Sequence, residues 1–151
     1  MKASLMARIL ILAVSFCIIP SVCAQYHCTL ESSTQTTVTF RVEGFAKNAK
    51  KAVIDAETKA VQTVLYSGVP GTAFSRPLIE GGKAEAEKRH EDFFKQFYKS
   101  DYKDFVEAGE TVKTFSKDKE KRKVMTLDVT VRITALRNYL ENNKIIRKFG
   151  L

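Results

Sequence analysis

Two separated parts of the chain alternate apolar and polar positions with the period of a half-buried strand. In residues 37–43 every second position is apolar, and the residues between them are Thr, Arg or Glu. Residues 123–133 repeat this pattern, with apolar positions at Met125, Leu127, Val129, Val131 and Ile133. The segment ETVKTF at 110–115 also favours a strand. We therefore predict three strands, the last two joined as a hairpin.

Three further segments carry the spacing of a helical face. Between residues 49 and 65 one stripe consists of small residues, Ala49, Ala52, Val53, Ala56, Ala60 and Val64, and a second stripe of Ile54, Val61 and Leu65. Such a helix is predicted to be covered on two sides. Residues 84–105 place aromatic side chains on one face, which predicts a second helix that fills a core. Thr134 is predicted to cap a third helix that begins at Ala135.

These elements predict an α+β fold in the order strand, helix, helix, strand, strand, helix. The expected sheet is small and mainly antiparallel, and the helices cover one of its faces. Residues 25–151 have the length of one domain with a core of its own.

Residues 1–24 have the features of a secretory signal peptide. Lys2 and Arg8 precede a largely apolar run from Ile9 to Ile19, and Val22-Cys23-Ala24 resembles a cleavage site. The run is shorter than the roughly 20 residues that span a bilayer. Cleavage after Ala24 would leave a mature chain that starts at Gln25, with no transmembrane segment and a periplasmic or secreted location. Lipidation at Cys23 is the alternative.

The chain carries a formal charge of +8, which favours anionic partners. Because an exported protein rarely meets nucleic acid, lipid headgroups, acidic glycans or an acidic protein face are the expected ones. Cys28 would be the single cysteine after cleavage, so no internal disulfide is expected. It is interpreted as a tolerated free thiol, with an intermolecular bridge or a reactive group as alternatives.

Four places in the sequence are candidate sites. Gly44, followed by lysines, resembles a phosphate loop but lacks the further glycines that such a loop needs, so the corner is interpreted as structural. The hairpin tip is the best candidate for anion contact, and solubilising charge is the alternative; its residues are Lys117, Lys119, Lys121, Arg122 and Lys123.

The loop at 67–82 and the tail at 144–151 are the candidates for protein contact. The loop contains several glycines and prolines together with apolar residues, and it either packs down on the domain or binds a partner. Phe74 and Leu78 are its candidate contacts. The apolar tail is expected to dock on the domain or on another chain, as in a homo-oligomer, through Ile146 and Phe149.

Catalytic and metal-binding motifs are missing from the sequence. It contains no HExxH, GxSxG or CxxC pattern. Paired carboxylates of a small secreted hydrolase leave no such motif and stay open. We therefore predict a protein that is not an enzyme and uses no metal or cofactor.

A strand ending in Val42-x-Gly44, a short polar step and then alanines at four-residue intervals (Ala52, Ala56, Ala60) resembles the amino-terminal domain of flagellar assembly protein T and related small bacterial envelope lipoproteins. The resemblance covers about residues 36–143. It implies association with other envelope proteins, so the predicted function is an exported binding or assembly module of the bacterial envelope. The alternative is a soluble binder of anionic glycan or lipid headgroups through the hairpin tip.

Overall fold

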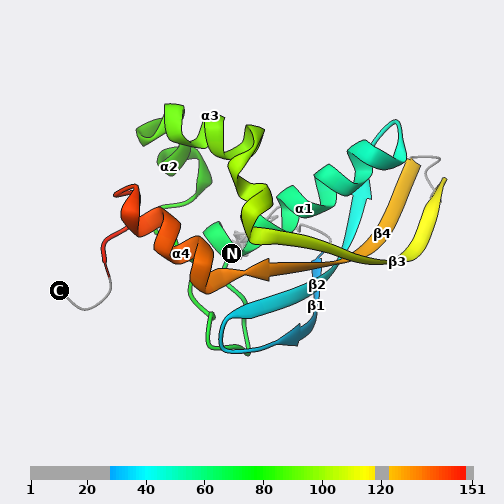
Figure 1. Cartoon of the computed structure of the whole chain (residues 1–151), viewed down its shortest axis with the longest axis horizontal. Helices are drawn as coiled ribbons and strands as arrows, with labels where there is room; N and C mark the ends of the chain where they lie inside the picture. Colours follow the sequence, from blue (N-terminus) through cyan, green and yellow to red (C-terminus); the bar gives the residue numbers. More distant parts are fainter. Residues whose placement is uncertain (1–27, 118–122, 149–151) are drawn as a thin grey trace, which may run out of the picture.

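The computed structural model describes residues 28–117 and 123–148 and confirms the α+β class. Four strands form one antiparallel sheet in the order β1-β2-β4-β3 (Figure 1). The strands are β1 (Cys28–Ser33), β2 (Thr37–Phe45), β3 (Val106–Lys117) and β4 (Lys123–Arg132). The helices are α1 (Ala49–Tyr66), α2 (Lys83–Arg89), α3 (Glu91–Lys99), the 3-10 helix η1 (Asp101–Phe105) and α4 (Ile133–Asn142).

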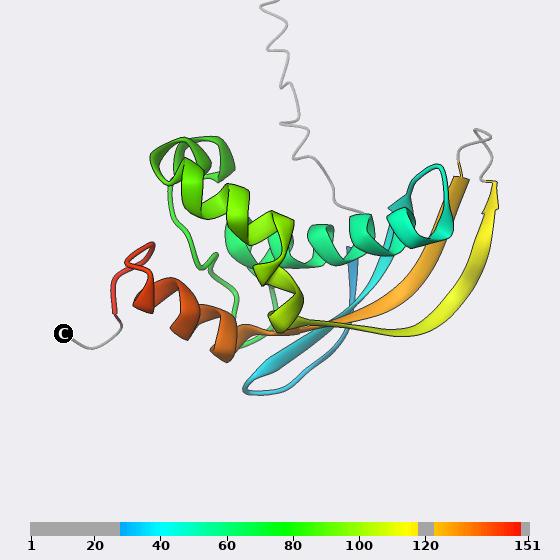
Figure 2. The same cartoon turned by 45° about the horizontal axis from the view of Figure 1, so that its top comes forward.

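The two faces of the sheet differ as the alternating pattern predicts. On one face Val38, Phe40 and Val42 are buried opposite apolar residues of β4, and α1 runs across this face (Figure 2). On the other face Arg41 donates to both carboxylate oxygens of Asp128, at 3.0 and 3.2 Å. Helices therefore cover one face, and the other carries polar side chains.

Helix α1 lies unusually close to β2 because the facing residues are small. Ala52, Ala56 and Ala60 are fully buried. A Cβ added to Gly44 would lie only 1.9 Å from the carbonyl oxygen of Ala52 and 3.2 Å from the Cβ of Ala56. The glycine at this corner thus makes room for the helix backbone, in agreement with the structural interpretation of the corner.

The element order differs from the predicted one at the amino-terminal end. β1 was not predicted, and the structure adds it to the edge of the sheet beside β2. Only Cys28 of its six residues is partly buried, so the strand lacks the apolar alternation by which the others were found. Backbone hydrogen bonds to β2 rather than side-chain burial hold it in place.

The predicted helix 84–105 is divided into three pieces. His90, with φ −127° and ψ 46°, separates α2 from α3, and Ser100, with φ −147°, separates α3 from η1. The buried face continues across both breaks, because Ala86, Phe94, Phe97 and Tyr102 are all buried, and from α3 onward it is aromatic. Because the buried residues keep the spacing of one continuous helix, the sequence pattern does not reveal the two changes of chain direction.

Two boundaries also differ from the prediction. The strand expected at 110–115 begins at Val106, ahead of Gly109, and continues to Lys117. The last helix begins at Ile133 without a side-chain cap, so the predicted capping role of Thr134 is wrong. Ile133 is fully buried, and this burial draws the residue into the first turn of α4.

The loop at 67–82 packs down on the domain. Its backbone N–H groups at Leu78 and Ile79 donate to the carbonyl oxygens of Val64 and Leu65 at the end of α1. Leu78 is 8% exposed and belongs to the core, and Phe74 is half-buried against it. This leaves Leu78 almost no surface to offer a partner.

Candidate functional site

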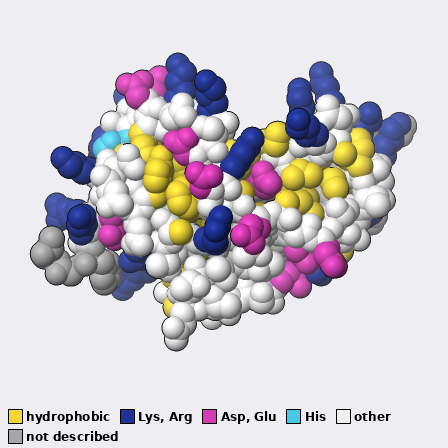
Figure 3. All heavy atoms as spheres, in the orientation of Figure 1, with side chains coloured by type: hydrophobic (Ala, Val, Ile, Leu, Met, Phe, Trp, Pro, Cys, Tyr) yellow, Lys and Arg dark blue, Asp and Glu magenta, His cyan; other side chains and the backbone are white. Residues whose placement is uncertain are grey.

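A groove of about 360 Å³ lies where α1 faces η1 and the start of β3. It is lined by Lys50, Val53, Ile54, Glu57, Lys103 and Val106. Four of these residues come from one side of α1, and the other two follow α3 in the chain. Apolar side chains form much of this surface, and charged side chains border it (Figure 3).

Ile54 gives the groove its exposed apolar wall. It belongs to the second predicted stripe of α1, whose other members, Val61 and Leu65, are fully buried. Ile54 instead keeps 38% of its surface exposed. The second side of α1 is thus covered toward its end and open near its start. An exposed large apolar residue bordered by Lys50 and Lys103 forms the kind of surface that a partner can cover.

Glu57 is the one carboxylate among the lining residues. The hydroxyl of Tyr102, itself buried, donates to Glu57 Oε2 at 3.2 Å. Burial raises the pKa of Glu57 above its ordinary value of 4.5, while the Tyr102 hydrogen bond and the positive charge of Lys103 act against that rise. Burial, followed by the charge of Glu57, raises the pKa of Tyr102 to about 12. Tyr102 therefore keeps its proton at neutral pH, and its hydrogen bond holds the Glu57 carboxylate at the groove.

We expect Glu57→Gln to change how stability depends on pH. Since folding raises the pKa of Glu57, the folded state holds this proton more tightly than the unfolded chain. The stabilising contribution is complete below the ordinary pKa and is lost as pH rises through the raised one. The variant lacks this loss, so its free energy of unfolding should rise relative to that of the wild type as pH increases above the ordinary pKa of 4.5 and through the raised one.

Chemical denaturation at a series of pH values measures this difference, and the carbon NMR signal of the Glu57 carboxyl gives its pKa directly. A difference between variant and wild type that stays constant across the series would show that Glu57 is not desolvated in the groove.

The structure brings two basic segments of the sequence together. Lys123 donates from Nζ to the carbonyl oxygen of Lys47 at 3.3 Å, and the N–H of Ala46 donates to the carbonyl oxygen of Lys123, also at 3.3 Å. Of the predicted anion contacts, Lys117 and Lys123 are exposed and stand directly opposite each other at the base of the hairpin. Lys119, Lys121 and Arg122 lie outside the described residues.

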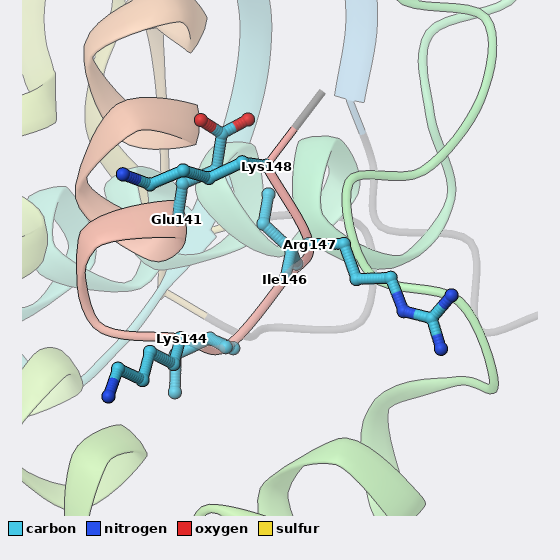
Figure 4. A pocket seen from close by; sticks show the side chains of 6 residues that line it. Glu141, Lys144, Ile146, Arg147 and Lys148 are labelled. Atoms are coloured by element: carbon cyan, nitrogen blue, oxygen red, sulfur yellow. The ribbon is translucent and has the colours of Figure 1, made fainter. Parts of the chain in front are cut away.

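The tail forms a second hollow, of about 530 Å³, lined by Glu141 and residues 144–148. Ile146 lies in the middle and is half-buried against the core, whereas Lys144 and Arg147 extend in different directions (Figure 4). These cations do not converge on one ligand. Phe149, the other predicted contact of the tail, lies outside the described residues.

Cys28 is partly buried at the first position of β1. Burial raises the pKa of its thiol, although Thr63 and Lys59 favour the thiolate. Within residues 28–117 and 123–148, no three His, Cys, Asp or Glu side chains are grouped as metal ligands. No helix in this described part is both long and apolar enough to cross a bilayer. The predicted signal peptide lies outside it.

No family model, curated protein or solved structure matches the chain. The resemblance to the flagellar assembly protein T domain therefore stays a prediction. The main residues of the groove are Ile54, Glu57 and Lys103, none of which was a predicted site residue. Of the three, only Ile54 was singled out by the sequence, as a member of the second apolar stripe that was predicted to be covered.

Proposed function

We propose that the protein is an exported, non-enzymatic binding module of the bacterial envelope and that it docks another envelope protein in the groove between α1 and η1. The groove itself is the observation that carries the proposal. It combines an exposed apolar wall at Ile54 with a carboxylate held by Tyr102 and with lysines at 50 and 103. Burial of an apolar anchor inside a charged rim is how protein interfaces are commonly built.

The arrangement suits binding better than hydrolysis. Acid and base catalysis of glycoside cleavage uses two carboxyl groups that face each other across the bond. The lining of the groove contains one, Glu57, and its other charged groups are the two lysines. Periplasmic or secreted location is part of the proposal and is supported by the sequence of residues 1–24.

The shape of β3 indicates how a partner would dock. β3 is an edge strand, but its pairing with β4 shifts register between Ala108 and Thr111, between Thr111 and Lys113, and between Lys113 and Ser116. Such bulges disturb the hydrogen-bonding groups that an added strand would need. We therefore infer that the partner does not add a strand to β3. Instead it inserts an apolar side chain beside Ile54 and places an acidic residue near Lys103, both of which line the groove.

Photo-crosslinking in the organism that encodes the chain tests this function. With benzoylphenylalanine in place of Ile54, we expect one discrete adduct with another envelope protein, because the probe would lie in the interface. The same probe in place of exposed Lys99 on α3 should give no such adduct. Adding Lys103→Glu should reduce the yield several-fold, whereas adding the matched Lys95→Glu should not.

Equal adducts from positions 54 and 99 would show that the groove has no specific partner. An adduct with a second copy of the chain would also overturn the proposal, because the groove would then serve self-association.

A further inference from the structure

Three segments that are distant in the sequence meet at one end of the molecule. Phe45 pairs with Val124 across β2 and β4, and Ser116 pairs with Val124 across β3 and β4. The start of α1 follows directly, where the side chain of Asn48 accepts the N–H of Lys51. The end of the sheet and the first turn of α1 therefore form one continuous surface.

Charge is segregated at this end. Residues 44–54, 114–117 and 123–127 contain no Asp or Glu, and the carboxylate of Asp55, which accepts the N–H of Phe45, is already paired with Lys59. The lysines of these three segments, all exposed, are Lys47, Lys50, Lys51, Lys117 and Lys123, and we call this set the basic end. None of them forms an ion pair with a carboxylate of the described residues. Figure 3 shows basic side chains, coloured for Lys and Arg together, gathered over the start of α1.

The basic end keeps like charges close to one another. Lys117 and Lys123 face each other across the hairpin, and Lys123 reaches back to the backbone of Lys47. Directly opposed like charges destabilise a strand pair. An anionic partner would relieve this repulsion, whereas water and salt only screen it.

An extended anionic surface fits this end better than a small anion does. The lysine side chains are exposed and spread over the β2–α1 connection, α1 and two strands. The space beside Gly44, where a phosphate loop would hold its ligand, is filled by the backbone of Ala52. The site therefore presents many separate contacts and no enclosed cradle.

Exposed apolar side chains on the same helix and strand as the lysines indicate the kind of surface. Ile54 follows Lys51 by one helical turn and is 38% exposed, and Val112 lies five residues before Lys117 and is 48% exposed. Lipid interfaces are bound by basic residues together with apolar ones that enter the boundary between headgroups and acyl chains. A sulfated or carboxylated glycan would use the lysines alone.

We propose that the basic end binds membrane surfaces that contain anionic phospholipid. The lysines contact the headgroups, and Ile54 and Val112 enter the interface. This binding goes beyond the docking function proposed above and competes with it at Lys50 and Ile54, the two residues of the lipid-binding surface that also line the groove.

Co-sedimentation with vesicles tests the proposal. The probes are vesicles of equal parts phosphatidylglycerol and phosphatidylcholine, and vesicles of phosphatidylcholine alone, at about 0.15 M salt. The protein is the full chain as isolated from the cell envelope. We expect it to bind the anionic vesicles and to bind the neutral ones far more weakly.

A pair of charge-matched variants locates the binding. Lys47→Gln, Lys51→Gln, Lys117→Gln and Lys123→Gln together should lower the affinity for anionic vesicles by at least about tenfold. The control replaces four exposed lysines elsewhere, Lys88, Lys95, Lys99 and Lys144, also with glutamine. It should retain most of the affinity. Equal losses in both variants would mean that net charge alone drives binding and would overturn the assignment to the basic end.

A second comparison separates lipid from other polyanions. Ile54→Ser combined with Val112→Ser should reduce vesicle binding several-fold and leave the salt needed to elute the protein from heparin unchanged. Unchanged melting temperatures confirm that the variants fold. Heparin retention that depends on the basic end, without vesicle binding, would identify a polyanion site and overturn the lipid proposal. That result would leave the crosslink from the groove to its partner unaffected.

Discussion

Replacing Gly44 with alanine is expected to remove about 3 kcal/mol of folding stability, the upper end of what overpacking of a close interface costs. The new Cβ would lie 1.9 Å from the carbonyl oxygen of Ala52. Because that atom belongs to the backbone of α1, a change of rotamer cannot relieve the clash, and the helix has to move off the sheet. Such a shift would open the contact made by Ala56 and Ala60, which are fully buried.

Thermal and urea unfolding measure the effect of this change, and Gly71→Ala is the matched control. Gly71 has a positive φ of 81°, but nothing lies within 4 Å of its added Cβ. That substitution should therefore cost about 1 kcal/mol through backbone strain alone. If Gly44→Ala destabilises the protein no more than Gly71→Ala does, the helix is not seated on β2 as closely as described.

Replacing Phe97 with alanine is expected to cost about 3–5 kcal/mol, the range typical of large aromatic residues in a core. Phe97 is fully buried at the centre of the aromatic cluster that joins α3 to η1 and α4. Its ring centroid lies within 5.4–6.5 Å of those of Phe93, Phe94, Tyr98, Phe105 and Tyr139. Loss of the ring leaves a cavity among five aromatic side chains, and these side chains lose the ring that all of them contact.

Urea unfolding monitored by the near-ultraviolet circular dichroism of the tyrosines checks this prediction. Lys95→Ala, on the exposed side of the same helix, is the control and should change stability by less than about 0.5 kcal/mol. A loss below about 1 kcal/mol in Phe97→Ala would show that α3 is packed loosely and that the cluster is not part of the cooperative core.

The groove could not be found from the sequence, although its residues can be explained afterwards. Val53 and Ile54 were assigned to apolar stripes of α1, which makes them candidates for burial. Whether such a residue is buried depends on what covers it. Here η1 and the start of β3 line the groove beside Ile54 but leave it 38% exposed. The partners of Glu57 are likewise about 45 residues away in the chain.

The sequence by itself determined the elements whose side chains alternate between core and solvent. β2, β4 and α1 were predicted because one face of each packs against the others, so burial repeats with the period of the backbone. The role of Gly44 as a structural corner was also visible, since the strand and the small-residue face of the helix meet there. In these cases a local pattern and the tertiary contact require the same residues.

Only the tertiary structure determined β1, the breaks at His90 and Ser100, and the convergence of the basic end. β1 is an edge strand held by backbone hydrogen bonds, which any side chain permits, so it leaves no apolar period. The breaks redirect a face that stays buried throughout. Lys47 and Lys123 are neighbours because β2 and β4 pair in one register, and that register is set by burial of the whole sheet rather than by either lysine segment.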